Sequence, residues 1–173
     1  MNIALLILRV VVGGVFAGHG AQKLFGWFGG HGLKNTGGFF ESIGFRPGTP
    51  MVFLAGGAEL GGGLLLAFGL FVPAAAAMLT GVMVSAIAAV HWEKGLWNQN
   101  GGIEFHVVLI AVAFAVAAIG AGRHSLDNAF GIDWHGLWWA IGAVGLGAVG
   151  GLASLLPGRR PPARQERHLR EAA

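Results

Sequence analysis

Apolar runs alternate with short polar connections along this chain, and the runs set the expected architecture. They cover approximately residues 3–25, 50–71, 74–92, 103–121 and 137–156. Each run is close to the roughly 20 residues that a helix needs to cross a ~30 Å hydrocarbon layer. The pattern predicts an all-α fold, a polytopic bundle of transmembrane helices. Four helices fall within residues 1–128, and residues 129–156 add a fifth.

The longest connection, residues 26–49, predicts a short helix lying in the headgroup layer. Asn35 or Thr36 would cap its beginning, and Gly44 followed by Pro47 would end it. Its apolar side chains fall near one face, which suits an interfacial helix. They are Phe39, Phe40, Ile43 and Phe45. The alternative interpretation is an ordinary loop with scattered phenylalanines.

Composition agrees with a membrane protein. Hydrophobic residues make up 54% of the chain and charged residues only 11%, whereas soluble domains average roughly 25% charged residues. Gly147 and Gly151 have the spacing of small residues that lets two membrane helices approach closely. Cysteine is absent, which excludes thiol redox chemistry and Cys-ligated clusters on this chain. Any redox role must therefore use a bound cofactor or a partner.

The basic residues predict membrane orientation rather than nucleic-acid binding. Five arginines lie in residues 157–173, which we expect to be a disordered cytoplasmic tail. With five spans, Lys34, Arg46 and Lys94 then also lie in the cytoplasm, and only Arg123 lies outside. Because positive residues stay inside, the expected topology in the cell inner membrane has the N-terminus out and the C-terminus in.

Several ionisable residues fall inside the apolar runs, and each is a candidate functional residue because burying it in a membrane is costly. They are Arg9, His19, Lys23, Glu59, His91, Glu104 and His106. Most of them lie near the cytoplasmic ends of the predicted helices, where they would form a polar ligand pocket. Arg9 and Glu59 fall at comparable depths, so we expect these two to pair within the bundle.

Structural roles are the competing interpretation. A buried pair of Arg9 and Glu59 could serve only to fix the register of two helices. Lys23 stands near a helix end, where a lysine can extend its ammonium group to the interface. Glu104 could be an ordinary acid in the first turn of a helix. The three intramembrane histidines could ligate haem or a metal, although no spacing is typical of such a site, and we predict no metal.

The order of several motifs resembles the DoxX family of membrane proteins. The stretches are LRVVVGGVFAGHGAQKLF at 8–25, GAELGGGLLLAFGL at 57–70, residues 83–91, GGIEF at 101–105 and GAGRHSLD at 120–127. The resemblance spans residues 5–128 and implies a four-helix core, leaving the fifth helix unexplained. The matching family positions carry no assigned catalytic role. They are Arg9, Lys23, Glu59, His91 and Glu104.

Members of that family include subunits linked to a thiosulfate:quinone oxidoreductase and proteins of redox or thiol-stress defence. The leading hypothesis is a membrane subunit of a quinone-linked redox system that binds quinone in the polar pocket and has no intrinsic cofactor. A soluble redox subunit would supply electrons, because the sequence has no dinucleotide motif. One alternative is a non-enzymatic scaffold, oligomeric or not, for soluble redox enzymes. Another is a small proton-coupled transporter, which the lack of an inverted repeat disfavours.

Overall fold

The computed structural model describes residues 2–156, and every regular element in that range is a helix. The longer elements are α1 (Asn2–Phe25), α2 (Gly32–Ser42), α3 (Gly48–Phe68), α4 (Val72–Ala86), α5 (Glu104–Ile119), α6 (Leu126–Phe130) and α7 (Leu137–Ala153). Short 3₁₀ turns are η1 (Trp27–Gly29), η3 (Trp92–Lys94) and η4 (Asn98–Asn100), and η2 (Ile87–His91) is a π-helix. The predicted tail lies outside the described residues.

The expected all-α bundle is confirmed, and each of the apolar runs contains a helix. Three continuous helical segments are long and apolar enough to cross a membrane, namely Asn2–Phe25, Gly48–Phe68 and Val72–Lys94. Helices α5 and α7 are apolar as well but contain 16 and 17 residues. At 1.5 Å per residue they extend about 24–26 Å, slightly less than a typical hydrocarbon core.

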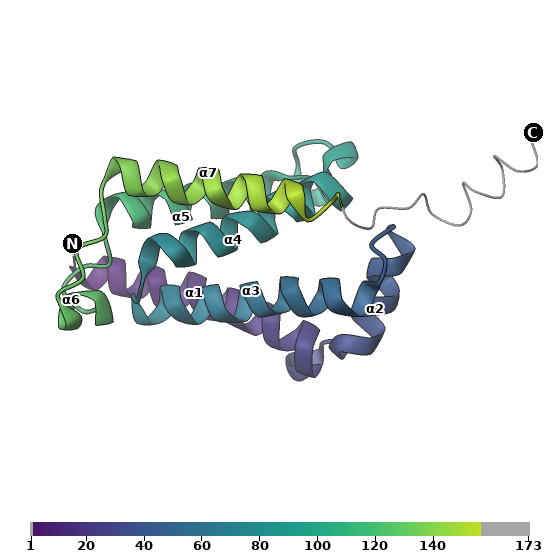
Figure 1. The fold of residues 1–173 in the computed structure, drawn as a ribbon, viewed down its shortest axis with the longest axis horizontal. Coiled ribbons are helices and arrows are strands. Elements are labelled where there is room, and N and C mark those ends of the chain that lie inside the picture. Colours follow the sequence, from purple (N-terminus) through teal and green to yellow (C-terminus); the bar gives the residue numbers. More distant parts are fainter. Residues whose placement is uncertain (1, 157–173) are drawn as a thin grey trace, which may run out of the picture.

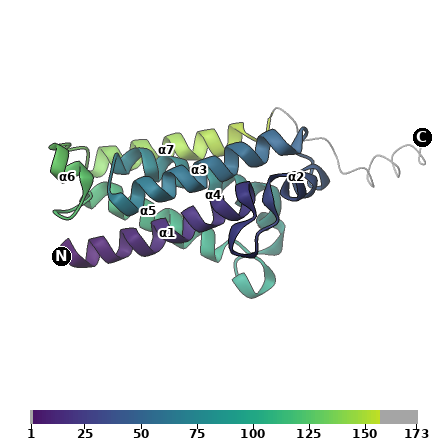
Figure 2. The same ribbon diagram turned by 90° about the horizontal axis from the view of Figure 1, so that it is seen from below.

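The helices form two layers that meet at one end of the molecule. Helices α1 and α3 lie side by side in one layer, and α5 and α7 lie in the other, as Figures 1 and 2 show. Helix α4 starts beside the end of α3 and runs obliquely toward α7, which it contacts along much of its length. The layers therefore touch near α6 and diverge toward α2.

Glycines allow the closest helix pairs to form. A Cβ on Gly13 or Gly20 of α1 would lie 2.5 Å from a backbone atom of α3, nearer than any real contact allows. Gly147 and Gly151 of α7 hold the same position against the backbone of α4, as their spacing predicted. Such contacts let backbones pack directly, which matters in lipid because dispersion replaces the hydrophobic effect between helices.

Helix α2 confirms the short helix expected in the long connection, but its beginning differs from the prediction. It starts at Gly32, with neither Asn35 nor Thr36 as its cap. Gly26 and Gly32 both have positive φ, so the turn η1 leads directly into α2 and the helix starts earlier. Phe45 beyond its end is 4% exposed and packs on Phe40 with ring centroids 5.5 Å apart. The aromatic face of α2 is thus turned toward the bundle.

Candidate functional site

A cavity of about 780 Å³ opens where the two layers diverge. Its wall is mainly apolar and comes from α1, α2, α3, α4, α5, α7 and the π-helix η2. Five ionisable side chains lie in that wall, and all of them were candidates from the sequence. They are His19, Lys23, Glu59, His91 and His106. A site of this composition suits a ligand with an apolar body and a small polar group.

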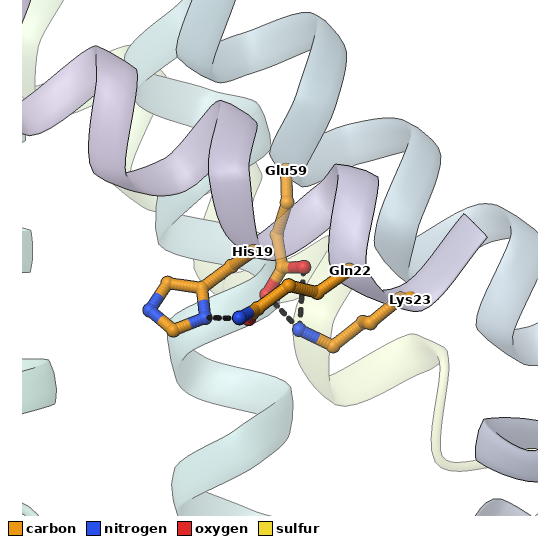
Figure 3. A network of polar contacts seen from close by, with 4 residues as sticks. All are labelled: His19, Gln22, Lys23 and Glu59. Atoms are coloured by element: carbon orange, nitrogen blue, oxygen red, sulfur yellow. Dashed lines mark hydrogen bonds and ion pairs between the residues drawn. The ribbon is translucent and has the colours of Figure 1, made fainter. Parts of the chain in front are cut away.

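An ion pair between α1 and α3 forms part of the wall. The Lys23 Nζ lies 2.7 Å from Oε1 and 2.5 Å from Oε2 of Glu59, and it donates to both oxygens (Figure 3). The Glu59 side chain is 5% exposed and that of Lys23 is 25% exposed. The ammonium group thus compensates a carboxylate that would otherwise be buried unpaired. The ammonium group of Lys23 is thus held by Glu59 and does not simply extend to the membrane interface.

The expected pairing of Arg9 with Glu59 is wrong. Arg9 is fully buried and donates from Nη2 to the carbonyl oxygen of His124 at 2.5 Å and from Nη1 to that of Ala67 at 3.5 Å. Ala67 lies in the last turn of α3, where helix carbonyls have no intrahelical donor and the dipole favours a cation. Because α1 and α3 run antiparallel, Arg9 reaches that end of α3 and Lys23 reaches Glu59.

A buried carboxylate completes the end of the bundle around Arg9. Asp127 in α6 is 4% exposed, and its two oxygens accept from the backbone N–H groups of Phe71 and Val72 at 2.8 and 3.3 Å. Those donors stand at the beginning of α4, where backbone N–H groups have no partner within the helix. Arg9 and Asp127 therefore tie four helices together outside the cavity, which is a structural role.

His19 belongs to a second polar chain at the edge of the cavity. Its Nδ1 lies 3.1 Å from Oε1 of Gln22 (Figure 3). The amide nitrogen of Gln22 donates to the carbonyl oxygen of Phe28 at 3.2 Å. The imidazole is exposed on the bundle surface. This chain of contacts places a titratable ring one helical turn from Lys23.

His91 and His106 face each other across the cavity wall. Their ring centroids are 4.3 Å apart with an interplanar angle of 43°. His91 ends the π-helix, a widened turn that is often found at functional sites. Its Nδ1 lies 2.6 Å from the carbonyl oxygen of Gly101, and a carbonyl can only accept, so Nδ1 carries the proton. The other ring nitrogen, Nε2, is then left for a ligand.

His106 has an unused polar atom. The residue is 9% exposed, and within residues 2–156 no hydrogen-bond partner is found for its Nδ1. A buried polar atom without a partner costs free energy, roughly 1–3 kcal/mol. The ring lines the cavity, but this nitrogen is itself inaccessible, so a ligand in the cavity would reach it only after the ring turned.

Glu104 lies outside the cavity wall. It is the first residue of α5, and its Oε2 accepts from the backbone N–H of Asn98 at 2.9 Å. The carboxylate thus holds the 91–104 connection against the start of the helix, in agreement with the structural interpretation of a first-turn acid. Arg9 and Glu104 are the two sequence candidates that do not line the cavity.

Much of the apolar wall could not be identified from the sequence. Helix α7, which the family resemblance left unexplained, contributes a strip of mostly small residues, and α2 contributes aromatic rings. These residues are Leu146, Gly147, Gly150, Gly151, Ser154, Phe39 and Phe40. Small residues on α7 signalled close packing in the sequence, and Gly147 and Gly151 do pack on α4, whereas Gly150 leaves open space in the cavity wall. That second consequence depends on where the helices diverge.

Fold and site together define a polytopic helical membrane protein with an open, mainly apolar cavity that has an ion pair and three histidines in its wall. Residues 4–92 match the model of the DoxX family, so the chain belongs to that family. The match extends from α1 to His91 and includes Lys23 and Glu59. No curated protein and no solved structure gave a match.

Proposed function

We propose that this protein is the membrane subunit of a quinone-linked redox system and binds a quinone in the cavity. The observation that carries the proposal is a 780 Å³ space with mainly apolar walls and five ionisable side chains. A quinone combines a flat apolar ring and a hydrocarbon tail with two carbonyl oxygens. The apolar walls would bury the ring and the tail, and polar groups in the wall would orient the carbonyl oxygens.

Several polar atoms of the cavity wall have hydrogen-bonding capacity left for a ligand. The ammonium group of Lys23 has three N–H groups, two of which serve Glu59. His91, with its proton on Nδ1, presents Nε2 as an acceptor, which would take a hydrogen bond from the hydroxyl of the reduced quinol rather than donate to a quinone carbonyl. The ring of His106 lines the cavity, and its unpartnered Nδ1 would meet a carbonyl oxygen once the ring turns. Carboxylate and imidazole groups can also hold the protons that quinone reduction takes up. Electrons would come from a soluble redox subunit, since the sequence has no cysteine to ligate a cluster.

The proposal includes the orientation expected from the basic residues. Lys34 in α2, Arg46 before α3 and Lys94 after the π-helix occupy the same end of the bundle as the cavity. In the cell inner membrane this end would face the cytoplasm, with the N-terminus outside. The cavity would then stand within reach of a cytoplasmic partner. Accessibility of single cysteines introduced at Lys94 and Arg123 to an impermeant thiol reagent tests the orientation.

Quinone binding is tested on the full chain purified in mild detergent. Mass spectrometry of the co-purified lipid-soluble molecules, with the ultraviolet and visible spectrum, should find a quinone close to one per protein. Glu59→Gln and His106→Leu should lose it. Asp133→Asn is the control, because that exposed carboxylate lies outside the cavity wall and pairs with His135 at 2.8 Å. A wild-type protein that carries no quinone and takes up none when it is added would refute the proposal.

A further inference from the structure

The walls of the cavity differ in chemistry from one side to the other. All five ionisable side chains come from α1, α3, η2 and α5. Helix α7 contributes no ionisable residue to the wall, and its single polar group there is the hydroxyl of Ser154. That hydroxyl already lies 3.1 Å from Ser85 Oγ and donates to the carbonyl oxygen of Gly151 at 2.7 Å. The α7 side therefore has no free hydrogen-bond donor to offer a quinone carbonyl.

The α7 side of the cavity also reaches the outer surface of the bundle. Leu54 of α3 and Leu146 of α7 both line the cavity, yet they are 63% and 69% exposed. Gly150 stands in the same wall, and a Cβ built on it would meet nothing within 4 Å. An apolar opening with large exposed side chains on both edges faces hydrocarbon in a membrane.

We propose that the hydrocarbon tail of the ligand leaves the cavity between α3 and α7, past Gly150, and that the site loads sideways from the bilayer. This inference rests on the proposed function, because the quinone ring takes the polar side. With the ring beside His91 and His106, a tail of several isoprenoid units must continue along an apolar path. The strip on α7 is the apolar continuation of the same cavity. The substrate class is thereby narrowed to quinones carrying a long tail.

We call the opening between α3 and α7 beside Gly150 the portal, and helix α4 forms its third side. Gly81 lines the cavity on α4, and Gly147 and Gly151 pack against its backbone from α7. These backbone contacts close the side between α4 and α7, so the open space beside Gly150 lies toward α3. A tail lying there would contact α3 and α7, and dispersion contacts rather than removal from water would hold it, because lipid and detergent are themselves apolar. Long-tailed quinones should consequently bind more tightly than the bare ring.

The test compares two probes on the purified full chain, a benzoquinone with a farnesyl-length isoprenoid tail and the same ring without a tail. Gly150→Phe should fill the passage without a clash, because open space surrounds that Cβ. It should weaken the tailed probe at least about tenfold and leave the tail-less probe within about twofold. Gly145→Phe is the matched control, since it is an equally open glycine on α7 outside the cavity wall.

The outcomes separate the portal from the proposed function. If the wild-type protein binds neither probe, the proposed function fails and the portal with it. If the wild type binds both and Gly150→Phe changes neither affinity, quinone binding stands and the portal is refuted. Equal losses for both probes would also refute it, since the substitution would then act on the ring site. Equal melting temperatures of the two phenylalanine variants show that folding is not the cause.

Discussion

The Nζ of Lys23 on α1 donates to both carboxylate oxygens of Glu59 on α3, at 2.7 and 2.5 Å, inside a membrane bundle. The two side chains differ in burial, with 5% exposure for Glu59 and 25% for Lys23. An unpaired ammonium group at that site can still approach solvent, whereas an unpaired carboxylate cannot. The two halves of the pair are therefore not equivalent.

That asymmetry predicts an order of stabilities. Lys23→Met should cost roughly 3 kcal/mol, because it leaves Glu59 buried without its partner. Glu59→Gln should cost less, and the double variant should lose less than the sum of the two single changes. Thermal unfolding in detergent of the three variants measures the order. Additive losses would show that the two side chains do not interact in the folded protein.

The close approach of the Arg9 guanidinium group to Gly69 leads to a second prediction. Gly69 has φ +65°, and a Cβ there would overlap the guanidinium group of Arg9. Gly69→Ala should thus destabilise by more than the roughly 1–2 kcal/mol that a left-handed backbone costs alone. Gly131→Ala is the control, with φ +68° and open space around the Cβ. In an Arg9→Met background, Gly69→Ala should cost less, because the overlap with the guanidinium group is gone while that with Ser125 Cβ remains. A similar melting temperature for both alanine variants would contradict the close packing of Arg9.

Contact between α1 and α3 can be tested with two glycines of the same helix. A Cβ on Gly20 would lie 2.5 Å from Leu60 N, whereas nothing lies within 4 Å of one on Gly18. Gly20→Ala should separate the helices and cost about 1–3 kcal/mol. Gly18→Ala should be neutral or stabilising, because alanine forms helix better than glycine. Melting temperatures decide, and a harmless Gly20→Ala would refute this interface.

The unpartnered nitrogen of His106 predicts that two substitutions of this residue will differ in quinone affinity. Asparagine can place an amide nitrogen near the position of Nδ1, whereas leucine fills the space without a polar atom. His106→Asn should keep quinone affinity within a few fold, and His106→Leu should weaken it about tenfold or more. Titration of the tailed benzoquinone measures both, and its carbonyl stretching band should shift only where the hydrogen bond forms. Equal binding by the two variants would remove His106 from the site.

The sequence alone determined the class of fold. Apolar runs of suitable length cannot be solvated in water, so a helical membrane bundle followed from hydropathy and from the scarcity of charge. The close pairing of Gly147 and Gly151 with a neighbour followed from their spacing. The family resemblance agreed with the match over residues 4–92. These properties are local, which is why a sequence can predict them.

Tertiary structure decided which charges meet. Depth arguments placed Arg9 beside Glu59. The packing register instead sets Gly20 of α1 against Gly56 and Leu60 of α3, so Lys23 is the cation that reaches Glu59. Arg9 instead donates to a carbonyl oxygen in the last turn of α3. Such carbonyl groups lack an intrahelical donor only at the end of a helix, so the position of that end decides the contact. The π-turn at His91 and the divergence of α4 from α3 likewise arise from packing between segments distant in sequence. The cavity that they create could therefore be located only in the folded chain.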